Sequence, residues 1–166
     1  EMWKAAPPAK RIVAVGTTAT FPVMKALVKV VSKLPQGEVC LAGLDKNLDD
    51  ESWNAIDETH PQFELKELLD YLQADRRDIA DLMPPANPER EKFISEIMRP
   101  AKTTDKWRDI AAAEIHHEAY DGIRLIDCDD VRKEALAIAL IMRETLEQPE
   151  KTAALVTTDR NLARRV

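Results

Sequence analysis

The chain has 166 residues, of which 24 are Lys or Arg and 30 are Asp or Glu, so its formal net charge at pH 7 is -6. This acidic balance excludes the overall basic surface of an autonomous nucleic-acid-binding domain, and any contact with DNA must therefore be local. No apolar run of about 18 residues and no signal peptide is present, which predicts a soluble, cytoplasmic chain without a membrane partner. Because the chain starts at Glu1 and stops within a short predicted helix, we expect it to be a segment of a longer protein.

The two cysteines, Cys40 and Cys128, are too few for a disulfide framework, and neither belongs to a C-x-x-C pair. We interpret both as small buried hydrophobic residues of a protein in a reducing compartment.

Residues 12–42 are predicted to form a strand, a helix and a second strand. The apolar run Ile12–Val15 has the length of a short buried strand, and a loop with Gly16 and three threonines follows it. Pro22 fits the first turn of a helix, and Val39–Ala42 is the second apolar run. A crossover of this length joins parallel strands. The apolar face expected for the helix consists of Val23, Leu27, Val30, Val31 and Leu34.

Residues 46–121 are predicted to contain helices and connecting loops without a convincing strand. Thr59 with Gln62 is expected to form a capping box for the first helix, Asn87-Pro88 opens the second, and Thr103 or Thr104 starts the third. The apolar residues expected on these helices are Leu65, Leu68, Leu69 and Leu72, then Phe93, Ile94, Ile97 and Met98, and finally Trp107, Ile110, Ala111 and Ile115.

The last quarter repeats the βαβ pattern. Two short apolar runs, Ile123–Ile126 and Ala153–Val156, flank a predicted helix over Val131–Glu147 that Asp129 or Asp130 can cap. Residues 135–142 of this helix are apolar on nearly every face, so we expect them to be buried against a sheet and other helices. The two units and the helical middle predict an α/β fold with short parallel strands. Asp159 is expected to cap a further short helix.

The loop Gly16–Thr20 is the first candidate site. In a doubly wound fold, a loop between a strand and the following helix directs backbone N–H groups and hydroxyls at a phosphate. The chain has no Gly-Lys pair and therefore no P-loop, so the Lys that would reach the β- and γ-phosphates is absent. A turn whose hydroxyls are satisfied within the protein is the alternative interpretation of the same loop.

Three other patterns resemble metal or nuclease motifs, and a structural interpretation is favoured for each. His116-His117-Glu118 would lie on a helix, where adjacent side chains do not converge on one ion. Acidic residues after the strand ending at Ile126 could hold magnesium, but a helix cap explains them more simply. The E-x-K pattern of Glu64 and Lys66 matches half of a nuclease motif that works from a strand, whereas here it lies in a predicted helix. The acidic residues in question are Asp127, Asp129 and Asp130.

Arg160, Arg164 and Arg165 are the best local candidates for contacts with a phosphate backbone. Arg160 and Arg164 are four residues apart and share one face of the last predicted helix. A solvated basic face, or a contact with the remainder of a longer protein, explains the same arginines equally well.

Four phrases in order and spacing resemble one family closely: the AddB subunits of bacterial AddAB-type helicase–nucleases, which repair DNA double-strand breaks, in their alphaproteobacterial form. These phrases are Ile12–Asp45, His60–Leu72, Glu89–Trp107 and Glu134–Val166, and they cover most of the chain. The resemblance implies that residues 1–45 end a first RecA-like lobe, residues 46–121 are a helical connection, and residues 122–166 begin a second lobe.

The resemblance also implies that the segment is not catalytic. Gly16-Thr17-Thr18 stands after the strand where an active relative carries magnesium-binding acids, and Thr157-Thr158 stands where an active relative commonly has a γ-phosphate-binding Arg. We therefore expect no cofactor and no metal in this segment. We expect packing against an AddA-type helicase–nuclease subunit, and DNA contacts in the intact complex from Arg160, Arg164, Arg165, Thr17 and Thr18.

Two other functions stay open on the residues alone. One is a small α/β enzyme that binds a phosphorylated metabolite at Gly16–Thr20, although no Ser/His/Asp or Cys/His set can be assigned to strand ends. The other is an acidic interaction module without a ligand.

Overall fold

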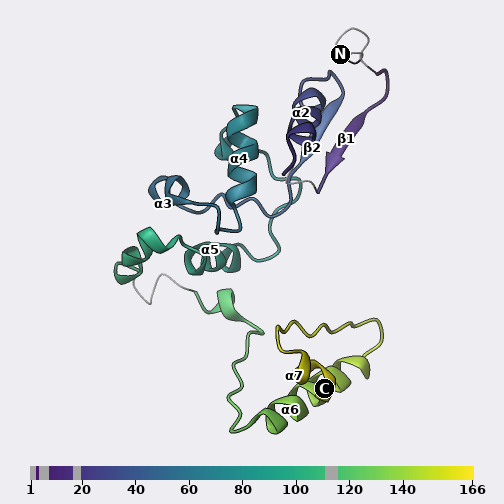
Figure 1. Cartoon of the computed structure of the whole chain (residues 1–166), viewed down its shortest axis with the longest axis vertical. Helices are drawn as coiled ribbons and strands as arrows, with labels where there is room; N and C mark the ends of the chain where they lie inside the picture. The colour runs from purple at the N-terminus through teal and green to yellow at the C-terminus, as the bar shows by residue number, and fades with distance from the viewer. Residues whose placement is uncertain (1–2, 4–7, 17–19, 111–115) are drawn as a thin grey trace. The chain divides into compact units, whose positions relative to one another are not determined.

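The computed structural model describes residues 3, 8–16, 20–110 and 116–166. The elements follow in the order β1, α2, β2, α3, α4, α5, α6 and α7, with short 3-10 helices between them (Figure 1). The chain divides into two compact units, residues 1–121 and residues 122–166. We call these unit 1 and unit 2 and describe each by itself.

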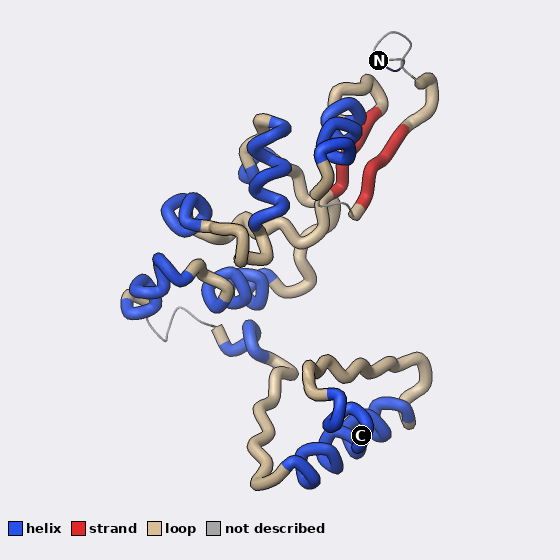
Figure 2. The backbone as a smooth tube through the Cα atoms, viewed as in Figure 1, coloured by secondary structure: helices blue, strands red, loops and turns tan. Residues whose placement is uncertain are grey.

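Unit 1 begins with the predicted βαβ crossover. Strands β1 (Ile12–Val15) and β2 (Gly37–Cys40) pair in parallel with Ile12 opposite Gly37, and helix α2 (Pro22–Val31) connects them. Figure 2 shows the two strands side by side with α2 along them. The mixed, parallel-strand character predicted for this part is therefore confirmed, with β2 two residues earlier than expected.

The apolar face predicted for α2 is only partly correct. Val31 is buried together with Val28, whereas Val23 and Leu27 are exposed. The helix packs on the sheet and on α4, and this places Val28 rather than Leu27 at the centre of the contact. The exposed residues Val13 and Val15 show that the opposite face of the two-stranded sheet is uncovered by the described residues.

The core of unit 1 lies between α2, β2 and α4 (Phe63–Leu72). Val28 and Leu68 are almost completely buried, and Val39, Leu41 and Leu72 pack against them. The predicted leucine stripe of α4 is confirmed, because three of its four leucines are buried and Leu72 is partly buried.

The capping box predicted for α4 is wrong. The Thr59 hydroxyl donates to the Asp57 carboxylate instead, and α4 has no side-chain cap. Gln62 reaches back toward the sheet, where its amide group accepts from the Asp45 N–H and donates to the Gly43 carbonyl. A tertiary contact has thus replaced the local one.

Helix α5 (Pro88–Ile97) starts as predicted, with Asn87 accepting from the Arg90 N–H and Pro88 in the first turn. Its predicted apolar side is wrong in part, because Ile94, Ile97 and Met98 are exposed and Ser95 is the buried residue. The helix directs Ser95 at the Asp45 carboxylate, a polar contact that periodicity cannot reveal.

The third predicted helix is a kinked 3-10 helix, η2 (Ala101–Arg108), in which Thr103 leaves helical geometry. Trp107 is about half exposed and donates to the Glu96 carbonyl. The predicted positions Ala111 and Ile115 lie outside the described residues. A further 3-10 turn, η4 (His117–Tyr120), packs on α5, and Tyr120 meets Phe93 edge to face at 6.4 Å.

Unit 2 consists of α6 (Val131–Leu146), α7 (Arg160–Arg165) and extended segments around them. The predicted α6 is confirmed, and of the two predicted caps, Asp129 and Asp130, it is the Asp130 carboxylate that accepts from the N–H groups of Arg132 and Lys133. The predicted strands Ile123–Ile126 and Ala153–Val156 are not formed in residues 116–166, all of which are described, and Figure 2 shows both as loop.

The predicted burial of α6 is also wrong. Leu136 and Leu140 are more than half exposed, and Ala135 is the buried residue of the helix. The physical reason is that residues 122–166, all of which are described, form no sheet of their own, because neither flanking segment finds a ladder partner. Across the described residues, no helix combines the length and the apolar character that a bilayer crossing requires.

Candidate nucleic-acid interface

Helix α7 positions the three predicted arginines. The Asp159 carboxylate caps the helix by accepting from the N–H groups of Asn161 and Leu162 at 2.7 Å and 3.3 Å. Leu162 is buried, and α7 packs against α6. Because residues on a helix advance by about 100° each, Arg160 and Arg164 point away from Leu162. The buried leucine therefore fixes the helix with these two guanidinium groups on the solvent side.

The three arginines of α7 are exposed, and within the described residues they make no ion pair. Two other basic residues of unit 2 are paired, Lys133 with Asp129 and Arg143 with Glu147, whereas Arg124, Arg132 and Lys151 are exposed and make no ion pair within the described residues. Unit 2 has eight basic and eight acidic residues, so the acidic excess of the chain belongs to unit 1. The arrangement leaves α7 as a small basic surface that can donate charge-assisted hydrogen bonds to phosphate oxygens.

The Gly16–Thr20 loop is described only at its ends. Gly16 has a left-handed φ of +68°, and its N–H donates to the Cys40 carbonyl at 3.3 Å, which extends the parallel ladder by one step. The predicted site residues Thr17 and Thr18 lie outside the described residues. The phosphate-binding role of this loop therefore stays a prediction.

The metal and nuclease patterns have structural roles. Asp130 caps α6, as favoured above, and no group of three His, Cys, Asp or Glu suited to a metal occurs in the described ranges. The Lys66 ammonium donates to the carbonyls of Asn54 and Ile56, so Lys66 ties α4 to the end of α3 (Asp50–Ala55). His117 lies 3.4 Å from the carboxylate of its neighbour Glu118.

Both cysteines are free and about half-buried, rather than fully buried as the sequence suggested.

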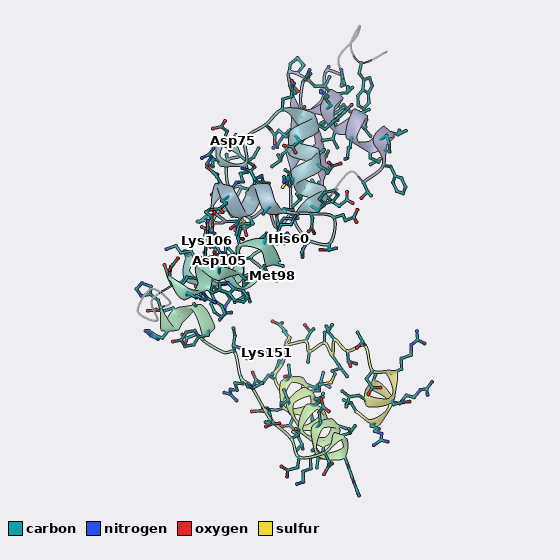
Figure 3. The ribbon with its side chains drawn as sticks, turned by 60° about the vertical axis from the view of Figure 1, so that its left-hand side comes forward. His60, Asp75, Met98, Asp105, Lys106 and Lys151 are labelled. Carbon is teal, nitrogen blue, oxygen red and sulfur yellow. The ribbon has the colours of Figure 1, made fainter. Side chains whose placement is uncertain are left out.

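His60 joins the start of α4 to the end of α5: its Nδ1 accepts from the Gln62 N–H, and its Nε2 lies 2.6 Å from the Met98 carbonyl. Because that carbonyl can only accept, the ring carries its proton on Nε2. Figure 3 shows His60 and Met98 next to each other.

A buried polar cluster around Arg99 is the main feature of unit 1 that sequence reasoning missed. Arg99 is only 9% exposed and pairs with Asp49 and with Glu96, which it binds at 2.7 Å. Lys106, labelled in Figure 3, binds the second oxygen of Asp49 at 2.8 Å. Ser52, also buried, donates its hydroxyl to Asp49. The cluster joins the start of α3, the end of α5 and η2.

The electrostatics of this cluster favour the fully charged state. Burial by itself would raise the pKa of Asp49, but hydrogen bonds from Lys106, Arg99 and Ser52 outweigh it and hold that pKa well below its usual range. Burial likewise opposes the charge on Arg99, yet Glu96 and Asp49 raise its pKa. Asp49 and Arg99 are therefore ionised at neutral pH and are partners for each other rather than acid–base groups.

A second cluster also fixes the start of α3, at Asp50. The buried Arg76 donates to the Asp50 carboxylate at 3.0 Å, and its guanidinium lies 4.8 Å from the centre of the Trp53 ring. Beside it, hydrogen bonds from the Arg77 side chain and N–H lower the pKa of Asp75 to about 2. No signal in the sequence predicts these contacts, because the residues are up to 27 positions apart and follow no repeat.

Both clusters are satisfied structural networks. Among the described residues, no buried side-chain nitrogen or oxygen lacks a hydrogen-bond partner. Since a catalytic group needs a free lone pair or proton directed at a substrate, Asp49 and Arg99 hold helices together and do not form an active site. The exposed arginines of α7 thus stay the strongest of the predicted functional residues.

Comparison of the chain with family models, with curated proteins and with solved structures finds no match.

Proposed function

We propose that the chain is a non-catalytic segment of an AddB-type subunit that works in cytoplasmic repair of DNA double-strand breaks. The observation that carries the proposal is the basic face of α7, where Arg160 and Arg164 point away from the buried Leu162 and have no acidic partner in the described structure. In the intact complex, these arginines and Arg165 contact the backbone of a DNA strand and form part of its channel.

The sequence resemblance to AddB subunits supports this role, and so does the lack of a P-loop. Without a Gly-Lys pair, the segment has no Lys to reach the outer phosphates of ATP. A DNA contact through α7 needs neither ATP nor metal, because exposed arginines bind phosphate oxygens directly.

The proposal includes packing of unit 2 against other parts of the complex, with an AddA-type subunit as the partner. Leu136 and Leu140 of α6 are more than half exposed, and Leu125 and Val156 of the flanking segments are 96% and 93% exposed. Scattered apolar residues are normal at a surface, but in unit 2 the exposed apolar residues outnumber the buried ones, which are Ala135 and Leu162. Burial of these side chains would release water from apolar surface and stabilise the assembly.

Packing of unit 2 against the rest of the complex also explains why the two predicted strands are not formed in this chain. Ile123–Ile126 and Ala153–Val156 would become parallel strands of a RecA-like lobe once neighbouring strands supply ladder hydrogen bonds. A right-handed crossover through α6 would then lie on that sheet.

The test measures binding of single-stranded DNA by the reconstituted two-subunit complex over a range of salt concentrations. Changing Arg160, Arg164 and Arg165 to Ala should weaken binding without regard to sequence and lower the slope of log K against log salt by about 0.7 per contact. The matched control is Arg143→Ala, which removes an exposed arginine already paired with Glu147. If the triple variant assembles normally and its salt slope is unchanged, the three arginines do not contact DNA and form only a solvated basic face.

A further inference from the structure

A groove on unit 1 has a chemistry unlike the rest of this acidic unit. It lies along the second half of α2 and beside the end of α4, with a volume of about 460 Å³. Trp3 and Tyr71 line it with two lysines, Lys29 and Lys33, and no acidic residue is among the described residues that line it. Val30 and Leu34 supply an apolar floor.

Lys29 is one of the two lysines of the groove, and it also contacts one of its aromatic residues. Its ammonium donates to the Tyr71 carbonyl at 2.8 Å and lies 4.4 Å from the centre of the Tyr71 ring. An ammonium has three donors, so this contact leaves others available to an anion. A cation held against an aromatic face is also already ordered, which lowers the entropic cost of binding a ligand.

Lys33 makes no ion pair within the described residues and is exposed. The contrast is Lys25 of α2, whose ammonium pairs with Glu67 at 3.0 Å. The lysine outside the groove is therefore neutralised, whereas the two lysines that line it are left without a carboxylate. A structural contact between α2 and α4 would explain the position of Lys29. It does not explain why Lys33 and Trp3 also line the groove.

We propose that this groove binds single-stranded nucleic acid, with a backbone phosphate at Lys29 and Lys33 and a base packed on Trp3 and Tyr71. Positively charged grooves with aromatic side chains are the common platform for unpaired strands, because every base has a face that can stack. A duplex hides those faces, so it should not use the aromatic residues. The site goes beyond the function proposed for α7, because it needs no partner subunit.

The test uses the whole 166-residue chain and a labelled oligothymidine of about eight nucleotides, within the span that such grooves hold. Fluorescence anisotropy at low salt should show binding. Tyr71→Ala should weaken it by about 5-fold to 150-fold, the loss expected for one stacking residue, whereas Tyr71→Phe keeps the ring and should bind like the parent. Lys33→Ala should lower the salt slope by about 0.7.

Lys25→Ala is the matched control, because it removes a lysine of α2 that lies outside the groove and that Glu67 already neutralises. It should leave binding unchanged. The proposal fails if the parent chain does not bind the oligonucleotide, or if Lys25→Ala and Lys33→Ala weaken binding equally. It also fails if a duplex, thymidine monophosphate or inorganic phosphate competes as strongly as the unpaired strand.

This outcome is separate from that of the α7 test. A chain that binds the oligonucleotide through Tyr71 while the arginine variants leave the two-subunit complex unaffected would retain the groove and reject the α7 interface. The reverse result would retain α7 and reject the groove.

Discussion

The two ends of the molecule carry the same sequence pattern, and only one of them builds a sheet. Near the amino terminus, two apolar runs flank α2 and pair as β1 and β2. Near the carboxyl terminus, Ile123–Ile126 and Ala153–Val156 flank α6 and stay unpaired. Both crossovers exceed the dozen residues that a parallel connection needs, so length does not separate them.

The difference lies in what the connecting helix packs against. Val28 of α2 meets Leu68 of α4, and Val39 of β2 packs on the same cluster. A third element thus holds helix and strand together in unit 1. In unit 2, α7 is the only further helix, and Leu162 buries against α6 without reaching a sheet. A βαβ pattern therefore identifies strand-forming segments, while strand formation depends on a partner outside the pattern.

The largest effect that would test this comparison is expected for Leu68→Ala. Leu68 is 0% exposed at the centre of the unit 1 core, so its truncation should lower the free energy of unfolding by about 2–5 kcal/mol. All three tryptophans lie in unit 1, which makes their fluorescence during urea unfolding a selective measurement. Leu82→Ala is the control, because Leu82 is largely exposed and should change little. Equal midpoints for the two variants would contradict the assigned core.

A smaller loss is expected for Arg99→Ala in the polar cluster of unit 1. The change removes the buried guanidinium that joins Asp49 to Glu96, and charged hydrogen bonds of this kind contribute about 1.5–3 kcal/mol. The same fluorescence measurement applies. The control is Arg108→Ala, which truncates an exposed arginine of η2. A loss no greater than that of the control would show that Lys106 and Ser52 hold Asp49 without Arg99.

The low pKa of Asp49 predicts that the free energy of unfolding depends on pH through this residue only at acidic pH. A carboxyl whose pKa is lower in the folded than in the unfolded chain stabilises the fold above the unfolded value of about 4, and this contribution is lost as the pH falls below it. Asp49→Asn should therefore lose less stability than the parent between about pH 4 and pH 2. Unfolding midpoints at several pH values measure this, and Asp70→Asn, at an exposed position of α4, is the control.

These residues also show how far sequence reasoning reaches. Asp159 was predicted as a cap and is one, Asp130 is the cap of the two candidates Asp129 and Asp130, and the helix predicted to open at Asn87-Pro88 is capped by Asn87, because capping depends on neighbours two or three residues away. The stripe of α4 followed from periodicity in the same local way. Arg99 and Asp49 are 50 residues apart and follow no pattern, so their pairing requires the fold.

The errors have the same origin. The run from Ala135 to Met142 predicts burial only if a sheet is present, and no local signal says whether one forms. Leu140 was accordingly expected in a core and is 57% exposed. For the candidate site, the sequence located α7 and its arginines, but it gave no sign of the groove, whose lining comes from residues as distant as Trp3 and Tyr71.

The smallest effect, and the sharpest test of the comparison, is expected for the double change of Leu136 and Leu140 to Ala. Exposed positions usually change stability by about 0.5 kcal/mol or less, and Ala is the better helix former, so α6 should unfold at nearly the parent temperature. Unit 2 has no aromatic residue, so helical circular dichroism and hydrogen exchange are the suitable measurements. The amides of Ile123–Ile126 should exchange rapidly in both proteins, because they have no ladder partner. If the double variant instead melts far below the parent, α6 is buried in a sheet after all. If it melts normally but fails to assemble with an AddA-type subunit, the exposed face of α6 has the docking role proposed for it.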